Sequence, residues 1–350
     1  MNSLLCLILN SLFLLLAMYS ELRQDLVTGD WIVVVPGRAK GHVFVNNEER
    51  VPSPIESCPF ETLPAQGADK TVLDIKNGGD WSVQIVPNIY PAVRREELQF
   101  SLANHGPYAV LPGVGQHDIL VTRDHNKNFP DLPPEHAFDV FAAFKERYLM
   151  LAKEKHLAYV AIFNNWGPKA GATLYHPHSQ IIALPIVPPD VGHSLRGSQN
   201  YFDRNNTCVH CVMIEFEIKE KARVLYENDC VIAFTPYISR SPFEMRIFPK
   251  AHLPYFEDSD ERVLKCVVDA LQISLRALRS TLNDPDYNFF IHTSPIKDRS
   301  SYGHYHWHLE IIPRVKINAG FEYGTGIDVN FVDPDEAAKL LYANFVALFS

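Results

Sequence analysis

The sequence lacks the excess of positive charge that nucleic-acid-binding proteins carry. It has 32 Lys and Arg against 41 Asp and Glu, which gives a formal charge of −9 at pH 7. A net negative chain is not drawn to a polyanion, so nucleic acid is not expected as a partner, although a local basic pocket would still bind phosphates. The apolar and charged fractions, 47% and 21%, are typical of folded proteins, and 350 residues suffice for one large or two medium domains.

The sequence also lacks a disulfide framework. Its cysteines show no regular spacing, and a chain of this size has no need of covalent staples to hold its core. We therefore expect a cytoplasmic protein with reduced thiols, some of them bound to metal. The six cysteines are Cys6, Cys58, Cys208, Cys211, Cys230 and Cys266.

A long hydrophobic segment is missing as well. The most apolar run, residues 4–17, is interrupted by Asn10 and Ser11 and is too short to span a bilayer comfortably. No Lys or Arg precedes it and no small-residue cleavage site follows, so it is a poor signal peptide. We interpret residues 1–17 as an upstream extension with Met18 as the start; a membrane anchor is the alternative.

What the sequence does have is histidine, 15 residues in all, arranged in a repeated pattern. The segment "HPHSQII", which begins at His176, matches "HWHLEII", which begins at His306. Further upstream, His125 is matched by His252, and "CPFE" at Cys58 is matched by "CVHC". The order Cys, strand, His, helix, strand, His-x-His thus occurs twice, which indicates two copies of one unit.

The expected elements of the two units also correspond. Alternating or β-branched runs predict strands at 81–88, 117–124, 159–165 and 179–187, and again at 231–237, 243–250, 287–294 and 306–313. Helical periodicity predicts one helix in each unit, at 133–154 and 259–282. The polar segment 187–206 is predicted to be turn-rich and to contain the boundary, giving units of residues 18–190 and 191–350. The fold class is α+β, with antiparallel sheets and packed helices; the pattern leaves open whether the units share one sheet.

His178 is the candidate nucleophile. On an extended strand His176, His178 and Gln180 point to one face, because side chains alternate. Neutral imidazole is a good nucleophile near pH 7, and its phosphoryl adduct stays reactive. Its second nitrogen must donate a hydrogen bond, most simply to a backbone carbonyl, while Gln180 can donate to a phosphoryl oxygen. A glycine-containing segment precedes the pair, in which Asn165, Thr173 and Lys169 are candidates for cradling phosphates.

Two sets of residues are candidate zinc ligands. Cys208 and Cys211 have the two-residue spacing of a zinc knuckle, and His252 and His306 would complete a closed tetrahedral site. In the first unit a carboxylate replaces the second thiolate, so the set is weaker and more sensitive to pH. A metal there would hold the strand that carries His178 without acting on the substrate. The first-unit set is Cys58, Glu61, His125 and His176.

The segments "CPFE", "HPHSQII" and "CVHC" resemble those of the galactose-1-phosphate uridylyltransferase family of the histidine-triad-like superfamily. The resemblance extends from about Glu21 to the last helix and is most specific at "HPHSQIIALP". It implies two tandem histidine-triad-like units, zinc, a homodimer, and UDP-glucose and a hexose 1-phosphate as substrates. It also implies a ping-pong transfer in which His178 carries a uridylyl group. By the same resemblance, the substrate would be contacted by Arg38, Asn88, Asn165, Thr173, Phe321, Glu322, Thr325 and Gly326.

Two departures from the family keep alternatives open. Glu61 stands where zinc-binding members have a thiolate, and the ending "FEYGTG" resembles a branch that includes an ADP-glucose phosphorylase, which transfers adenylyl to phosphate. A hydrolase of the histidine-triad type is a third possibility, but those enzymes have a histidine where Gln180 stands to assist the leaving group. A non-catalytic nucleotide-binding or zinc-scaffold protein is the fourth.

Overall fold

The computed structural model describes residues 19–36, 50–61, 71–77, 80–95 and 102–347. Its centre is a single ten-stranded antiparallel sheet in the order β10-β11-β12-β14-β13-β8-β9-β7-β4-β3. The five strands of each half follow the same order, and β8 pairs with β13 at the middle. The α+β class and the duplication are therefore confirmed, and the question of a shared sheet is answered: the two units form one.

The strands of the first half arise from the alternating segments of the sequence. The central strand β9 places Ser179, Ile181 and Ala183 in the core and leaves the residues between them half-buried. Since side chains alternate across a sheet, the half-buried positions, including His178 and Gln180, share the opposite face. The strands are β3 (Leu73–Asn77), β4 (Asp80–Pro87), β7 (Gln116–Thr122), β8 (Tyr159–Trp166) and β9 (His178–Leu184).

The strands of the second half repeat this arrangement with more of their surface buried. Every residue of β11 and β12 is buried, because other parts of the chain cover both faces there. The strands are β10 (Val224–Glu227), β11 (Val231–Phe234), β12 (Met245–Pro249), β13 (Tyr287–His292) and β14 (His308–Pro313).

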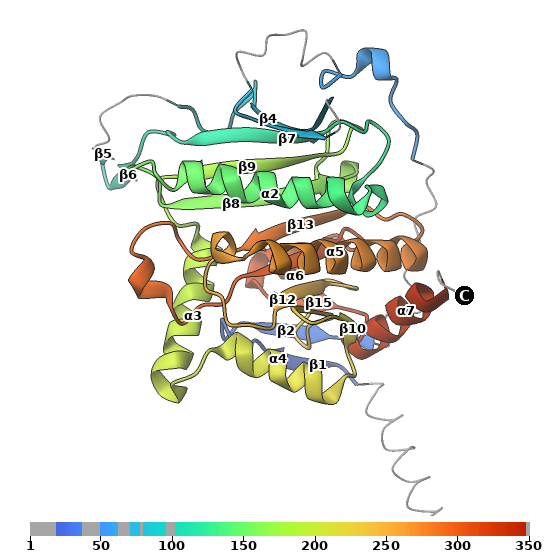
Figure 1. Ribbon diagram of the computed structural model, residues 1–350. Coiled ribbons are helices and arrows are strands. Elements are labelled where there is room, and N and C mark those ends of the chain that lie inside the picture. The colour runs from blue at the N-terminus through green and yellow to red at the C-terminus, as the bar shows by residue number, and fades with distance from the viewer. Residues whose placement is uncertain (1–18, 37–49, 62–70, 78–79, 96–101, 348–350) are drawn as a thin grey trace, which may run out of the picture.

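Two long helices cover one face of the sheet (Figure 1). They are α2 (Pro134–Leu151) and α5 (Glu261–Leu282), at the two predicted places. Helix α5 begins where the Asp260 carboxylate accepts a hydrogen bond from Val263 N, which satisfies one unpaired amide of the first turn. Both helices bury an apolar stripe against the sheet in one continuous core.

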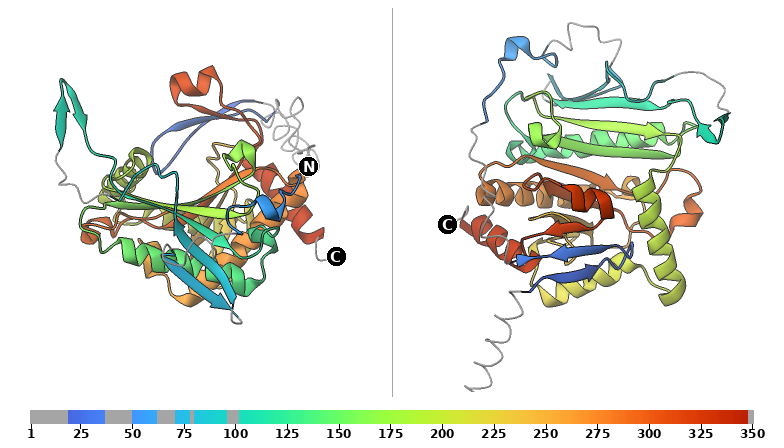
Figure 2. Two further views of the ribbon diagram at one scale, coloured as in Figure 1. Left: turned by 90° about the horizontal axis from the view of Figure 1, so that it is seen from above. Right: turned by 180° about the vertical axis from the view of Figure 1, so that it is seen from behind.

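A further layer lies on the opposite face of the second half (Figure 2). A small sheet lies there, formed by β1 (Glu21–Gln24), β2 (Trp31–Val34) and β15 (Asp328–Asn330), together with the short helix α6 (Gly320–Thr325). The N-terminal hairpin therefore pairs with the end of the chain. A separate hairpin, β5 (Ala103–His105) with β6 (Tyr108–Val110), projects from the first half.

The segment 187–206, predicted to be turn-rich, is a helix, so that prediction was wrong. Helix α3 (Pro189–Asn205) buries Val191, Leu195 and Ser198, whose spacing of three to four residues forms one inner face. Its polar composition reflects an exposed outer face, and Pro189 at the first helical position needs no amide partner. Helix α4 (Val209–Glu220) follows at once, with Cys208 at its N-cap.

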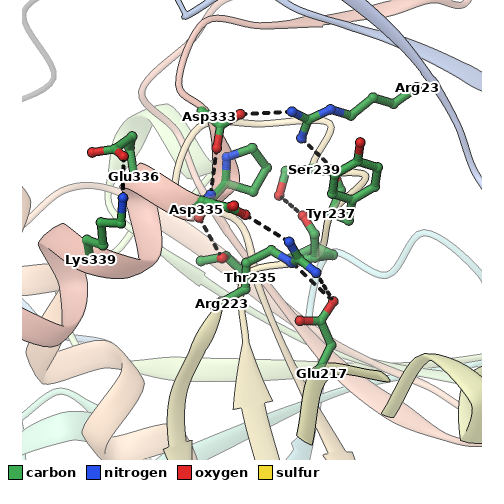
Figure 3. Close-up of polar contacts among 12 residues, drawn as sticks. Arg23, Glu217, Arg223, Thr235, Tyr237, Ser239, Asp333, Asp335, Glu336 and Lys339 are labelled. Carbon is green, nitrogen blue, oxygen red and sulfur yellow. Dashed lines mark hydrogen bonds and ion pairs between the residues drawn. The ribbon is translucent and has the colours of Figure 1, made fainter. Parts of the chain in front are cut away.

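Helix α7 (Pro334–Ala347) closes the fold through a buried polar network (Figure 3). Arg223 donates hydrogen bonds to Glu217 of α4 and to Asp335 of α7, both at 2.8 Å. The ring of Tyr237 lies beneath this guanidinium group and beneath that of Arg23 on β1, at 5.2 and 4.2 Å. Because each buried charge has partners, the network attaches both ends of the chain to the second half. No helix among the described residues combines the length and apolarity needed to cross a bilayer.

Candidate active site

His178 opens strand β9 and is held by its own backbone. Its Nδ1 donates a hydrogen bond of 2.9 Å to the carbonyl oxygen of His176. This fixes the neutral tautomer with the lone pair on Nε2, as predicted from the need for a carbonyl partner. Burial lowers the pKa of His178, and the bond to His176 only partly offsets that effect. The ring is therefore neutral and nucleophilic at pH 7.

The backbone of His178, the candidate nucleophile, is held from β8. Asn164 donates to the carbonyl oxygen of His178 at 2.8 Å and to Ser179 Oγ at 3.2 Å. Asn164 is buried and lies opposite Ser179 in the pairing of β8 with β9, so the position of His178 is set by the sheet. A reacting group placed on a strand in this way is held more precisely than one on a loop.

Gln180 lies two residues further along the same face and is joined to a residue that the sequence analysis missed. Its Oε1 is 2.9 Å from Nε2 of His117, the second residue of β7. Asn88, a predicted nucleotide contact, has its amide nitrogen 3.1 Å from the same ring atom. The available signal was a histidine at the start of the strand predicted at 117–124, and the strand prediction did not consider its side chain.

The glycine-containing loop before His176 is fastened to the second half. Asn288 of β13 donates to Asn165 Oδ1 and to the carbonyl oxygen of Ala170, both at 2.8 Å. Asn165 thus lies on β8, the strand that pairs with the His178 strand β9. Thr173 and Lys169 instead line a cavity of about 420 Å³ that His178 does not line.

The remaining predicted substrate residues are not brought to His178 by any described contact. Arg38 lies outside the described residues. Helix α6 carries the other four, and its polar groups cap the helix itself: Ala319 N donates to Glu322, and Thr325 donates to the Phe321 carbonyl. Phe321 is 51% exposed, and Gly326 ends the helix in the left-handed conformation.

Three of the four residues of the first predicted metal set, Cys58, His125 and His176, have donor atoms within 4.8 Å of one another, and Glu61 lies beside the two histidines. The Nδ1 atoms of His125 and His176 lie 3.2 Å apart, and each is 3.4 Å from Glu61 Oε1. The Sγ atom of Cys58 is 3.5 Å from His176 Nδ1. Both histidines donate from Nε2, to the carbonyl oxygens of Ser53 and Thr122, at 2.9 and 2.8 Å.

These bonds show why the first set suits a cation. With both Nε2 atoms protonated, two Nδ1 lone pairs face each other beside Glu61 Oε1, a buried oxygen without a hydrogen bond. Such an arrangement is repulsive unless a proton or a metal ion lies between the donors. The other oxygen of Glu61 pairs with Arg123 at 3.0 Å, which weakens the carboxylate as a ligand.

The second predicted metal set also converges. The donor atoms of Cys208, Cys211, His252 and His306 all lie within 4.8 Å of one another. His252 donates from Nε2 to the Gly303 carbonyl at 2.8 Å, so its Nδ1 faces the cysteines. The pKa of Cys208 is lowered, chiefly by the hydrogen bond from Cys211, which favours the thiolate that binds metals.

The second half contains a buried counterpart of His178. His308 corresponds to His178, and its Nδ1 likewise contacts the His306 carbonyl, at 3.1 Å. However, His308 is only 3% exposed, and Glu310 stands where the first half has Gln180. Glu310 pairs with the buried Arg246 at 3.0 Å. A buried carboxylate would repel a phosphate, so the two halves differ in what they can bind.

Comparisons with known proteins agree with this geometry. A family model described as "Galactose-1-phosphate uridyl transferase, N-terminal domain" matches residues 15–188, and one described as "Domain of unknown function (DUF4921)" matches residues 133–348. An ADP-glucose phosphorylase of Arabidopsis thaliana is 34% identical over 92% of both chains. A galactose-1-phosphate uridylyltransferase of Thermotoga maritima is 26% identical over 92% of this chain and 97% of the relative.

Solved structures show the same relationship across the whole chain. A crystal structure of the Arabidopsis ADP-glucose phosphorylase with bound ADP-glucose has a TM-score of 0.79 and 31% identity, and covers 93% of this chain and 98% of that one. A uridylyltransferase structure has a TM-score of 0.72 and 26% identity, and covers 95% and 100%. Fold and sequence together define the protein as a nucleotidyltransferase. The chain belongs to the galactose-1-phosphate uridylyltransferase family, as the sequence analysis predicted.

The conformation of the loop before His176 requires glycine at position 167, and we expect this position not to tolerate a side chain. Its φ is +84°, and an added Cβ would lie 2.0 Å from Asp286 Oδ1. Asp286 accepts hydrogen bonds from Lys169 N at 2.6 Å and from Arg50 at 2.8 Å, so its displacement would release the loop. We predict that Gly167→Ala lowers the free energy of unfolding by about 1–3 kcal/mol in a denaturant titration.

Gly113→Ala is the matched control for this substitution. No atom lies within 4 Å of a Cβ at Gly113, so it should change stability by less than about 0.5 kcal/mol. Equal effects of the two substitutions would show that the contact with Asp286 does not hold the loop.

Proposed function

We propose that this protein transfers a nucleotidyl group from a nucleoside diphosphate sugar, carrying it on His178. The observation that supports this is the hydrogen bond from His178 Nδ1 to the His176 carbonyl, which leaves the lone pair on Nε2 of a half-buried ring. Gln180 lies on the same face of β9 as His178 and has no acidic hydrogen. It can stabilise a phosphoryl oxygen but cannot protonate a leaving group.

In the proposed first step, Nε2 of His178 attacks the α-phosphorus of the nucleotide sugar. A P–N bond forms, and the bond from that phosphorus to the bridging oxygen breaks, with both electrons leaving on the sugar 1-phosphate. The leaving group is already a stable anion, so no general acid is needed. The Nδ1 proton stays bonded to the His176 carbonyl and supports the positive charge that develops on the ring.

In the second step, an oxygen of the acceptor phosphate attacks the same phosphorus from the side opposite the histidine. The new P–O bond forms as the P–N bond breaks, and His178 returns to its neutral form. The acceptor is an anion with a free lone pair, so no general base is required. A histidine at position 180 would favour protonation of a leaving group, as in the hydrolases, and Gln180 argues against that chemistry.

For the donor we favour ADP-glucose, with inorganic phosphate as the acceptor. This preference rests on the similarity to the Arabidopsis ADP-glucose phosphorylase, 34% identical over 92% of both chains, and on the "FEYGTG" segment. Transfer of uridylyl from UDP-glucose to a hexose 1-phosphate, the leading prediction from the sequence, is the second candidate. The similarity to the Thermotoga uridylyltransferase supports it.

We assign substrate contacts in two groups. Asn88 lies beside Gln180 and is proposed to contact the nucleotide with Arg38, while Asn165 and Thr173 are proposed to serve the phosphates. The second group, on α6, is proposed to serve the sugar: Phe321, Glu322, Thr325 and Gly326. The predicted homodimer and cytoplasmic location also remain proposals.

We further propose zinc as the metal of both donor sets. Two thiolates and two imidazoles are a typical structural zinc site, and the mixed Cys-Glu-His-His set is a competent one. Bound at the first set, zinc would supply fixed positive charge that holds its ligands together. His176 is one of them, and its carbonyl orients the nucleophile, so the expected role is structural.

The covalent step predicts a mass change. Incubated with ADP-glucose and no acceptor, the protein should gain one adenylyl group in intact mass spectrometry, and His178→Ala should gain none. His308→Gln, which alters the buried counterpart, is the matched control and should still be modified if circular dichroism shows it folded. A uridylyl adduct formed only from UDP-glucose would select the second candidate. Folded wild-type protein that forms no adduct with either donor would contradict the proposed function.

Metal content is predicted to follow the donor sets. Elemental analysis of protein purified with zinc present should give about two zinc ions per chain, and Cys211→Ser should lose about one of them. Cys230→Ser is the control, because Cys230 belongs to neither set, and should keep both ions. Full zinc retention by Cys211→Ser, or its absence from the wild type, would refute the assignment.

A further inference from the structure

His117 occupies a position from which it can control the amide of Gln180. In the pairing of β7 with β9, Ile119 lies opposite Gln180 and His117 lies opposite Ile182. Residues offset by two in neighbouring strands are diagonal neighbours on one face of a sheet. His117 is only 9% exposed, so its ring is held between the strand and the segment that contains Asn88 and Ala92.

The tautomer of the His117 ring follows from its hydrogen-bond partners. Ala92 N, a donor only, lies 3.0 Å from Nδ1 of His117, so Nδ1 must be the acceptor. A neutral ring then carries its single hydrogen on Nε2. That hydrogen is directed to Gln180 Oε1, which lies 2.9 Å away.

Asn88 does not compete for this hydrogen. Its Oδ1 accepts a hydrogen bond from Tyr90 N at 2.9 Å, so the amide turns its NH₂ group toward the ring. Two donors cannot bond to each other, and the 3.1 Å approach of Asn88 to His117 is a contact without a shared proton. The Nε2 hydrogen of His117 therefore has one acceptor, the Gln180 carbonyl.

This arrangement decides which end of Gln180 faces the reaction. The oxygen and nitrogen of a side-chain amide are close to the same size, so without a fixed partner the group can turn over at little steric cost. With its oxygen held by His117, the amide directs its NH₂ group away from His117. No hydrogen bond from that NH₂ group to another described side chain or carbonyl is present. A reversed amide would present an oxygen to the anionic phosphoryl group and repel it.

We propose that His117 is a positioning residue for nucleotidyl transfer: by donating from Nε2 it fixes the Gln180 amide with its NH₂ group toward the phosphoryl oxygen. The inference rests on the proposed function, because it assigns a task to Gln180 in that reaction. It adds a role for a residue that touches neither the nucleophile nor the donor sets. Through Ala92 and Asn88 it also links the segment proposed to hold the nucleotide to the reacting group.

Two substitutions of His117 distinguish its hydrogen bond to Gln180 from its hydrogen bond with Ala92 N. Glutamine at this position can place an N–H near the Nε2 position, so His117→Gln keeps the donor for Gln180. Asparagine can place an oxygen near the Nδ1 position, so His117→Asn keeps the acceptor for Ala92 N but loses the donor. Each variant keeps one bond and loses the other, and both remove the ring. A loss caused by the cavity alone should therefore appear in both.

The measurement is the single-turnover rate of adduct formation at His178, with the apparent affinity for the nucleotide sugar determined in the same titration. Removing a fixed donor from a developing anion commonly slows a reaction ~100-fold, so its misorientation should slow adduct formation about 10-fold or more. We expect this in His117→Asn with little change in affinity, and a rate within about 3-fold of wild type in His117→Gln. In a Gln180→Ala background, the two variants should react at the same rate.

Each contrary result has a distinct meaning. An unchanged rate in His117→Asn, an equal fall in His117→Gln, or the same fall in the Gln180→Ala background would overturn the positioning role, because the effect would then not pass through Gln180. These outcomes leave the covalent reaction intact. Absence of an adduct on the wild type would instead overturn the proposed function, whatever the variants do.

Discussion

The hydrogen bond from His178 Nδ1 to the His176 carbonyl is the constraint on which the site depends. His176 contributes two different contacts. Its backbone carbonyl orients the ring of His178, while its side chain faces Cys58 and His125. His176 is 1% exposed, and its Nε2 donates a hydrogen bond to the Thr122 carbonyl. The backbone carbonyl of His176 that orients His178 is therefore held in place. The remaining features of the site, from the Asn164 bonds to the proposed His117 bond, refine an orientation that this contact sets.

Duplication of the unit explains how the position of His178 is held. Both halves have the same strand order and the same contact between a histidine ring and the preceding carbonyl, at His178 and at His308. In the second half the face is covered, and Glu310 binds Arg246 where Gln180 is available in the first. The second half thus supports the first half: β13 pairs with β8, and Asn288 holds the loop that leads to His178. The network around Tyr237 attaches both the β1 strand and helix α7 to this half.

Much of this could be read from the sequence, because regular elements leave periodic patterns. The two long helices, eight of the ten strands of the central sheet, the duplication and both donor sets were predicted from spacing and composition. Segment 187–206 was not, since a helix exposed on one side has few apolar residues, and only Val191, Leu195 and Ser198 mark its inner face. His117 was missed for another reason. Its partners, Ala92 and Gln180, are distant in sequence, and only the pairing of β7 with β9 brings them together.

The central claim, transfer through a covalent His178 adduct, is tested most directly by stereochemistry at phosphorus. The substrate would be a nucleoside diphosphate glucose with sulfur replacing one α-oxygen in a single configuration, and the product would be analysed for its configuration. Two successive in-line displacements, first by His178 and then by the acceptor, each invert the centre, so the account predicts net retention. Net inversion would mean a single direct displacement by the acceptor, and would contradict a nucleotidyl-histidine intermediate.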